Sequence, residues 1–259
     1  MKIRKNKTNL KKIIKNNKKS IFLAILALIL VLSVGRGGLY LMHKHAVDEV
    51  FTDKMPYSIL GVDVSHYQGD IDWKTLKKQN ISFAFIKATE GEAFVDDRFD
   101  YNWRHANSAL IKRGAYHFFS FDADPEAQAK NFIHTVPKRK NALPPVVDFE
   151  IYGKYNDNPP SPSYLVPRLE AYINAIEHHY KVQPIIYCNK YCYNKYIRDN
   201  FSNPIWLANP SMSPTLPDGK QWHFLQYSFY GQLEGYNGIK HIDLNVYYGT
   251  KEQFWDEYY

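Results

Sequence analysis

The sequence predicts one α/β domain, a closed barrel of parallel type with an incomplete outer ring of helices. Eight short apolar segments rich in β-branched and aromatic residues follow Tyr57, as is typical of strands. Helical periodicity separates the early segments, but little room remains for helices between the last three. There is no internal repeat at a fixed period. The length suits one large domain, which we expect over residues 58–259.

The expected strands are Ser58–Val64, Ile81–Ala88, Gly114–Phe121, Pro145–Ile151, Gln183–Tyr187, Pro204–Ala208, Trp222–Tyr227 and Ile242–Tyr247. Asp124 followed by Pro125 gives an N-cap and a first-turn proline, which predicts a helix through Val136. Two further helices are predicted by apolar residues at helical spacing. These are Phe99, Trp103, Ala106 and Leu110 for one, and Leu165, Leu169, Tyr172, Ile173 and Ile176 for the other.

The net charge of +7 comes from one end of the chain. Residues 1–20 hold nine positive side chains and no acid, while the other 239 residues carry 24 positive and 26 negative side chains. The rest of the chain therefore has a net charge of −2, and a nucleic-acid-binding domain is not expected. Two cysteines in 259 residues exclude a disulfide scaffold.

The N-terminal segments have the layout of a membrane address. A basic tail (1–20) precedes the apolar run Ile21–Val34, so residues 21–35 are expected to be a signal anchor or a cleaved signal peptide. The anchor is favoured because the basic region is long and no clear cleavage site follows. Residues 36–57 would be a juxtamembrane linker. The positive charges keep the tail cytoplasmic and place the domain outside the membrane, or release it if the signal is cleaved.

Four carboxyl groups are expected at one rim of the barrel, where parallel barrels carry their functional residues. Asp63 ends the first strand, Asp148 and Glu150 end the fourth, and Asp243 lies in the last. The i, i+2 spacing of Asp148 and Glu150 places both on one face. Such a cluster suits glycoside hydrolysis, in which one carboxylic acid protonates the leaving oxygen and other carboxylates stabilise positive charge. Acids that only cap loops are the alternative for any single residue.

Nine short motifs in this order resemble the family 25 glycoside hydrolases, the N-acetylmuramidase or lysozyme family. The resemblance covers about Ser58 to Tyr248. The motifs are Asp63–Gly69, Ile71–Trp73, Lys87–Gly91, Gly114–Phe118, Asp148–Glu150, Tyr187–Asn189, Trp206–Ala208, Gln226–Ser228 and Asp243–Asn245.

The resemblance implies a (β/α)5(β)3 barrel that cleaves the β-1,4 bond between N-acetylmuramic acid and N-acetylglucosamine in peptidoglycan. It implies that Glu150 is the general acid and that Asp148 assists it, with Asp63 and Asp243 completing an acidic floor. Aromatic and amide side chains would bind the sugar, namely Tyr116, Phe118, Tyr187, Trp206 and Gln226. No metal or cofactor is implied, and the catalytic domain is expected to be monomeric.

Other classes of protein fit less well. A chitinase-like D-x-x-D-x-D-x-E pattern is absent, because Pro145 stands three residues before Asp148. The histidines lack the spacing of a metal-dependent deacetylase. Cys188 and Cys192 are expected to be small buried residues rather than a disulfide or metal site. The remaining alternative is a non-catalytic cell-wall-binding or scaffold protein on the same barrel, which would be expected to lose Asp148 or Glu150.

Overall fold

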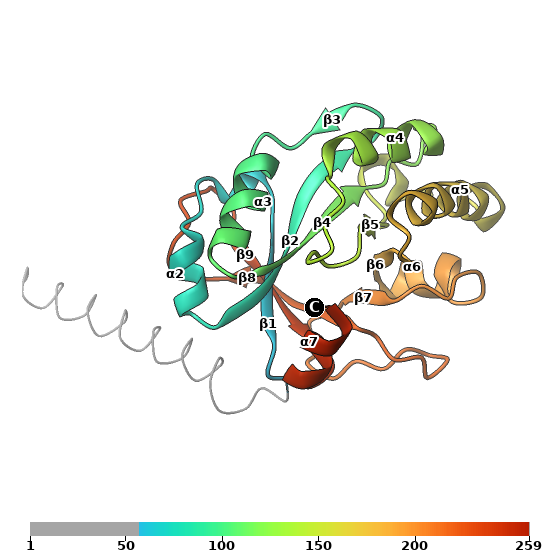
Figure 1. Ribbon diagram of the computed structural model, residues 1–259. Coiled ribbons are helices and arrows are strands. Elements are labelled where there is room, and N and C mark those ends of the chain that lie inside the picture. The colour runs from blue at the N-terminus through green and yellow to red at the C-terminus, as the bar shows by residue number, and fades with distance from the viewer. Residues whose placement is uncertain (1–56, 259) are drawn as a thin grey trace, which may run out of the picture. The chain divides into compact units, whose positions relative to one another are not determined.

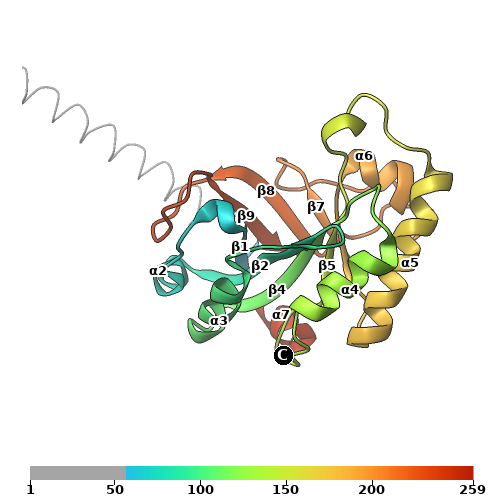
Figure 2. The ribbon, with the colours of Figure 1, turned by 90° about the horizontal axis from the view of Figure 1, so that it is seen from above.

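The computed structural model describes residues 57–258, which form a barrel closed by eight strands (Figures 1 and 2). The predicted tail (1–20), apolar segment (21–35) and linker (36–57) lie, apart from Tyr57, outside the described residues. Within the described part of the chain, no helix is long and apolar enough to cross a bilayer.

The sheet order is β1-β9-β8-β7-β6-β5-β4-β2, and pairing of β1 with β2 closes the barrel. The two-residue strand β3 is added at the edge of β2. The strands are β1 (Leu60–Val64), β2 (Ile81–Glu90), β3 (Phe94–Val95), β4 (Lys112–Phe118), β5 (Val146–Asp148), β6 (Ile185–Asn189), β7 (Ile205–Ala208), β8 (Phe224–Gly231) and β9 (Ile242–Tyr247).

All barrel neighbours from β1 through β2 and β4 to β8 are parallel, whereas β9 runs antiparallel to both β8 and β1. The predicted barrel of parallel type is therefore confirmed, with β9 as the one antiparallel strand among its eight. The connection from β8 to β9 is short and holds no helix, and a short connection favours an antiparallel return. As a result, the beginning of β9 lies at the rim where the parallel strands end.

Helices cover only part of the barrel, as the sequence predicts. They are α2 (Trp73–Lys78), α3 (Phe99–Ser108), α4 (Pro125–Thr135), α5 (Pro162–Tyr180), the short α6 (Lys190–Cys192) with the π-helical turn η3 (Tyr193–Ile197), and α7 (Lys251–Tyr258). Two 3-10 turns, η1 (His66–Gln68) and η2 (Gly153–Tyr155), follow β1 and β5. None of these helices lies between β7 and β9.

Local chemistry explains where the helices begin and end. The Asp124 side chain accepts a hydrogen bond from the backbone N–H of Ala127 and Pro125 opens α4, which confirms the predicted start. The predicted apolar face of α5 is buried. Leu110, however, has φ 59° and is 78% exposed, because α3 has already ended at Ser108.

The barrel interior is filled by aromatic side chains. Phe83 and Phe85 of β2 pack edge-on against Phe224 of β8, with ring centroids 5.1 Å apart in each case. The helix α7 lies across the end of the barrel where β1 begins, and its Phe254 and Tyr258 belong to this core (Figure 1). Large buried rings of this kind dominate core stability.

Candidate active site

All nine predicted site residues line one cavity of about 300 Å³ at the carboxyl-terminal rim of the parallel strands. The structure brings together Asp63, Asp148, Glu150 and Asp243 with Tyr116, Phe118, Tyr187, Trp206 and Gln226. A further hollow of about 520 Å³ shares Asp63, Glu150 and Asp243 and continues the cleft towards the β8–β9 loop. The roles assigned to these residues stay predictions.

Asp148 and Glu150 reach the cavity from the end of β5. The strand itself stops at Asp148, but Phe149 still donates its N–H to the Tyr187 carbonyl at 2.9 Å. The extended backbone therefore continues, and the fully buried Phe149 points away from the cavity between its two acidic neighbours. Asp148 is 8% exposed, whereas Glu150 is partly exposed at the cavity mouth.

The Asp148 and Glu150 carboxyl groups are held in a poorly solvated, negatively charged environment. Burial, followed by the charge of Glu150, raises the pKa of Asp148 well above its usual value. Burial, followed by the charge of Asp63, raises the pKa of Glu150. Asp148 Oδ1 is buried and has no hydrogen-bond partner among the described residues. An unpaired buried acceptor of this kind is costly, and a bound ligand that donates a hydrogen bond would relieve the cost.

Asp63 is the centre of a buried hydrogen-bond network. Gln226 Nε2 and Asn245 Nδ2 each donate to Asp63 Oδ2 at 2.8 Å. The orientations of both amides are fixed by donors on their other side. Tyr187 donates to Gln226 Oε1 at 2.6 Å, and the Trp206 indole donates to Asn245 Oδ1 at 2.8 Å.

Asp63 and Asp243 face each other across the β1–β9 pairing. Burial raises the pKa of Asp63 to about 6, although the hydrogen bonds from Asn245 and Gln226 oppose the shift. Burial and the charge of Asp63 raise the pKa of Asp243 to about 8. Between these values the pair holds one proton, because two adjacent buried carboxylates repel each other.

Tyr187 and Trp206 lie deeper than a sugar-stacking role would require. Trp206 is 2% exposed and stacks on Phe85 with ring centroids 4.3 Å apart, and Tyr187 is 7% exposed. Their polar atoms hold the two amides that bind Asp63. Both residues therefore form the floor of the site, while Tyr116 and Phe118 are more accessible.

Sequence reasoning missed several cavity residues. Tyr67 and Phe229 line the cavity and are 45% and 42% exposed, so they offer accessible aromatic faces at the mouth. Tyr67 lies within the Asp63–Gly69 motif, and its place in that motif could have identified it as a residue of the cavity. Lys87 also lines the cavity and forms an ion pair with Glu90, at 2.6 Å. Its charge opposes the rise in the pKa of Asp148 and Glu150.

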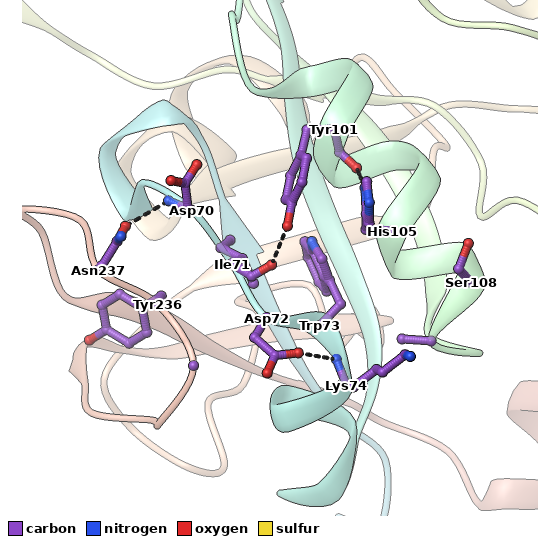
Figure 3. Close-up of a pocket in the computed structure, with 12 residues that line it drawn as sticks. Asp70, Ile71, Asp72, Trp73, Lys74, Tyr101, His105, Ser108, Tyr236 and Asn237 are labelled. Carbon is purple, nitrogen blue, oxygen red and sulfur yellow. Dashed lines mark hydrogen bonds between the residues drawn. The ribbon is translucent and has the colours of Figure 1, made fainter.

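A separate cavity of about 570 Å³ lies on the outer flank of the barrel (Figure 3). It is lined by residues of α2, α3 and the β8–β9 loop and contains none of the nine predicted residues. Its polar groups bond mainly to one another, as Tyr101 does to the Ile71 carbonyl at 3.1 Å and Asn237 to the Asp70 N–H at 2.8 Å. We assign this hollow a structural role, as the junction of the three segments.

The two cysteines and His117 do not belong to the cavity. Cys188 and Cys192 are buried and not bridged, as the sequence predicts. His117 is fully buried and contacts Thr89 at 2.7 Å and Gln128 at 3.1 Å, and burial lowers its pKa to about 4. The imidazole is therefore neutral and joins β4 to α4.

Four carboxyl groups gathered at one rim of an α/β barrel are the arrangement that glycoside hydrolysis requires, which indicates a glycosidase. The sequence model of the glycosyl hydrolases family 25 matches residues 62–236, and the chain belongs to this family. The chain is 34% identical over 209 residues to lysozyme M1 of Streptomyces globisporus, covering 74% of this chain and 68% of that protein. It is also 36% identical over 203 residues to the uncharacterized protein YegX of Escherichia coli, covering 76% and 72%.

Solved structures agree with this assignment. A family 25 glycosyl hydrolase from Bacillus anthracis superposes with a TM-score of 0.75 at 48% identity, covering 80% of this chain and 96% of that chain. A lysozyme from Streptomyces coelicolor gives a TM-score of 0.69 at 31% identity, covering 76% and 95%. Because the Asp148 and Glu150 pair is intact, the non-catalytic alternative is not favoured.

Proposed function

We propose that the chain is a peptidoglycan hydrolase that cleaves the β-1,4 bond between N-acetylmuramic acid and N-acetylglucosamine. The observation that carries this proposal is the Asp148 and Glu150 pair, in which an accessible carboxyl lies beside a buried carboxyl with an unpartnered oxygen. The family and its lysozyme members support the choice of substrate.

Glu150 is the general acid in this proposal. Burial and the charge of Asp63 raise its pKa, which favours the protonated form that a general acid needs, and its exposure at the mouth allows it to reach the leaving oxygen. When the glycosidic bond breaks, its electron pair goes to that oxygen, which takes the Glu150 proton. In the second step, the Glu150 carboxylate removes a proton from the water that attacks the anomeric carbon.

Asp148 orients the N-acetyl group of the substrate. Its free Oδ1 accepts the amide N–H, so that the acetyl oxygen can attack the anomeric carbon as the leaving group departs. Water then opens this cyclic intermediate with net retention of configuration, and the anionic partner of the Asp63 and Asp243 pair stabilises the positive charge. NMR of the first-formed product tests this course, and an inverted anomer would contradict it.

The chain is further proposed to be anchored in the membrane by residues 21–35, with the basic tail in the cytoplasm and the barrel in the cell envelope. The support is the sequence pattern of nine positive charges before an apolar run. Protease accessibility of the barrel on intact cells, together with its retention in the membrane fraction, tests this topology. Release of the barrel into the medium would instead mean that the signal is cleaved.

The activity is tested with a chain that begins at Pro56. This part is a separate compact unit whose sheet closes on itself, and the Bacillus anthracis chain, 96% of which is covered, consists almost entirely of it. Incubation with purified peptidoglycan should release muramic acid reducing ends, identified by mass spectrometry. Glu150→Gln should abolish release, and Glu170→Gln on the exposed side of α5 is the matched control. Glucosamine reducing ends, or equal release by Glu150→Gln, would contradict the proposal.

A further inference from the structure

The end of the barrel opposite the active site is the end at which the chain enters. Tyr57 packs against Trp222 and Tyr248, with ring centroids 5.3 and 6.2 Å apart. Trp222 precedes β8 and Tyr248 follows the antiparallel β9, so both lie at the end where the parallel strands begin. The segments that precede β5 and β6 lie at this same end.

Cations gather around a cavity at this end. Lys138, Arg139 and Lys140 are consecutive and exposed, and all three line a cavity of about 620 Å³ between the α4–β5 segment and the end of α5. His179 and Lys181 adjoin them. Burial lowers the pKa of His179, and the nearby charges of Lys138 and Lys181 lower it further. We call these five residues the basal patch.

Few acidic side chains lie near the cations of the basal patch. Within residues 57–258, Lys138, Arg139 and Lys140 take part in no ion pair. Glu257 is the carboxylate among the residues that line the cavity, and it accepts a hydrogen bond from the Tyr247 hydroxyl at 2.7 Å.

Arg113 adds a buried cation beside the patch. Its guanidinium lies over the Trp103 ring, 4.5 Å from the centroid, and Trp103 lines the same cavity. Arg113 is 6% exposed, and its Nε has no hydrogen-bond partner among the described residues. Burial lowers the pKa of Arg113, and the charge of Arg139 lowers it further. This end of the barrel therefore concentrates positive charge around a hollow.

The two ends of the barrel differ in the kind of charged side chain they hold. The catalytic rim holds Asp63, Asp148, Glu150 and Asp243 with one lining cation, Lys87. An anionic surface is therefore attracted by the basal patch, and the catalytic rim offers no comparable cluster of cations.

We propose that the basal patch docks on the anionic surface of the membrane from which the chain emerges, which leaves the active-site mouth facing away from the bilayer. This proposal rests on the membrane anchor proposed above, because the anchor brings the surface within reach. The charge complementarity and the entry of the chain at the same end both select the membrane as the occupant. Each basic residue near an anionic bilayer contributes about 1 kcal/mol at physiological ionic strength.

The test uses the chain that begins at Pro56, so that the anchor itself cannot bind. The chain is sedimented with vesicles of phosphatidylcholine containing 30% phosphatidylglycerol, and with vesicles of phosphatidylcholine alone. We expect binding to the anionic vesicles only, with loss of binding at high salt. Replacing Lys138, Arg139 and Lys140 together by Gln should lower the partition coefficient by about a hundredfold.

The matched control replaces Lys74, Lys130 and Lys190 by Gln, which removes the same charge from exposed positions elsewhere. Equal weakening by both triple variants, binding to neutral vesicles, or failure of the parent to bind anionic vesicles would overturn the proposal. Release of muramic acid ends from soluble peptidoglycan fragments is measured in parallel. The patch variant should keep this activity, so a failure of docking and a failure of the proposed reaction are told apart.

Discussion

Neutralising Asp63 should remove activity and yet stabilise the barrel at neutral pH. Burial raises the pKa of Asp63 from 3.8 to about 6. The folded state therefore keeps a proton that the unfolded chain has already lost, so stability falls as pH rises from about 4 to about 6. At about 1.4 kcal/mol per pKa unit, ionised Asp63 costs the folded state about 3 kcal/mol above that range.

The substitution Asp63→Asn keeps the shape of the side chain and removes this cost. Its amide oxygen can still accept from Gln226 and Asn245, and its amide nitrogen can donate to Asp243. We expect Asp63→Asn to match the parent near pH 4 and to exceed it by about 2–3 kcal/mol at pH 8. In urea unfolding, this corresponds to a midpoint about 1 M higher.

Tryptophan fluorescence can follow the unfolding transition, because all five tryptophans lie within residues 57–258. The chain that begins at Pro56 is measured in urea at pH 4, 6 and 8. Equal stability of variant and parent at pH 8, or a larger gain at pH 4 than at pH 8, would refute the reasoning. The exposed change Asp256→Asn in α7 is the control and should alter stability by less than about 0.5 kcal/mol.

Three further predictions follow from single contacts. Lys87→Met removes the charge that lowers the pKa of Asp148 and Glu150, so the acid limb of the kcat/KM profile should move to higher pH. An unmoved limb would contradict this. Burial raises the pKa of the Cys188 thiol well above its usual value. We therefore expect this thiol to resist Ellman's reagent at pH 8 in the folded chain and to react with it in the unfolded chain. Gly61→Ala places a Cβ 2.4 Å from the Phe83 ring. Thermal unfolding should show that the free energy of unfolding falls by about 1–3 kcal/mol, and adding Phe83→Leu should restore part of this loss.

The sequence predicted the elements of the barrel because their signals are local. Apolar runs of strand length, the Asp124–Pro125 cap and the apolar face of α5 each depend on neighbours along the chain. The direction of β9 was not predicted, because it depends on how the last connection closes the sheet. Leu110 matched a helical spacing, but the spacing carries no information on the left-handed turn that ends α3.

The sequence predicted nine residues that line one cavity, but it did not predict how deeply each is buried. Asp148 and Glu150 follow from strand alternation at the end of β5. The burial of Tyr187 and Trp206 instead depends on partners supplied by distant strands. Asn245 lies within the Asp243–Asn245 motif. Its hydrogen bond to Asp63, however, spans 182 positions along the chain and forms only when the barrel is closed.

The meeting of β1 and β9 also sets when the enzyme can become active during its synthesis. Asp63 is made early, but Asp243 and Asn245, which complete its surroundings, belong to the last strand. A nascent chain that has not yet released β9 from the ribosome therefore has no acidic floor, whatever the state of its other strands. The surroundings of Asp63 are therefore complete only when the last strand has paired with β1 and β8.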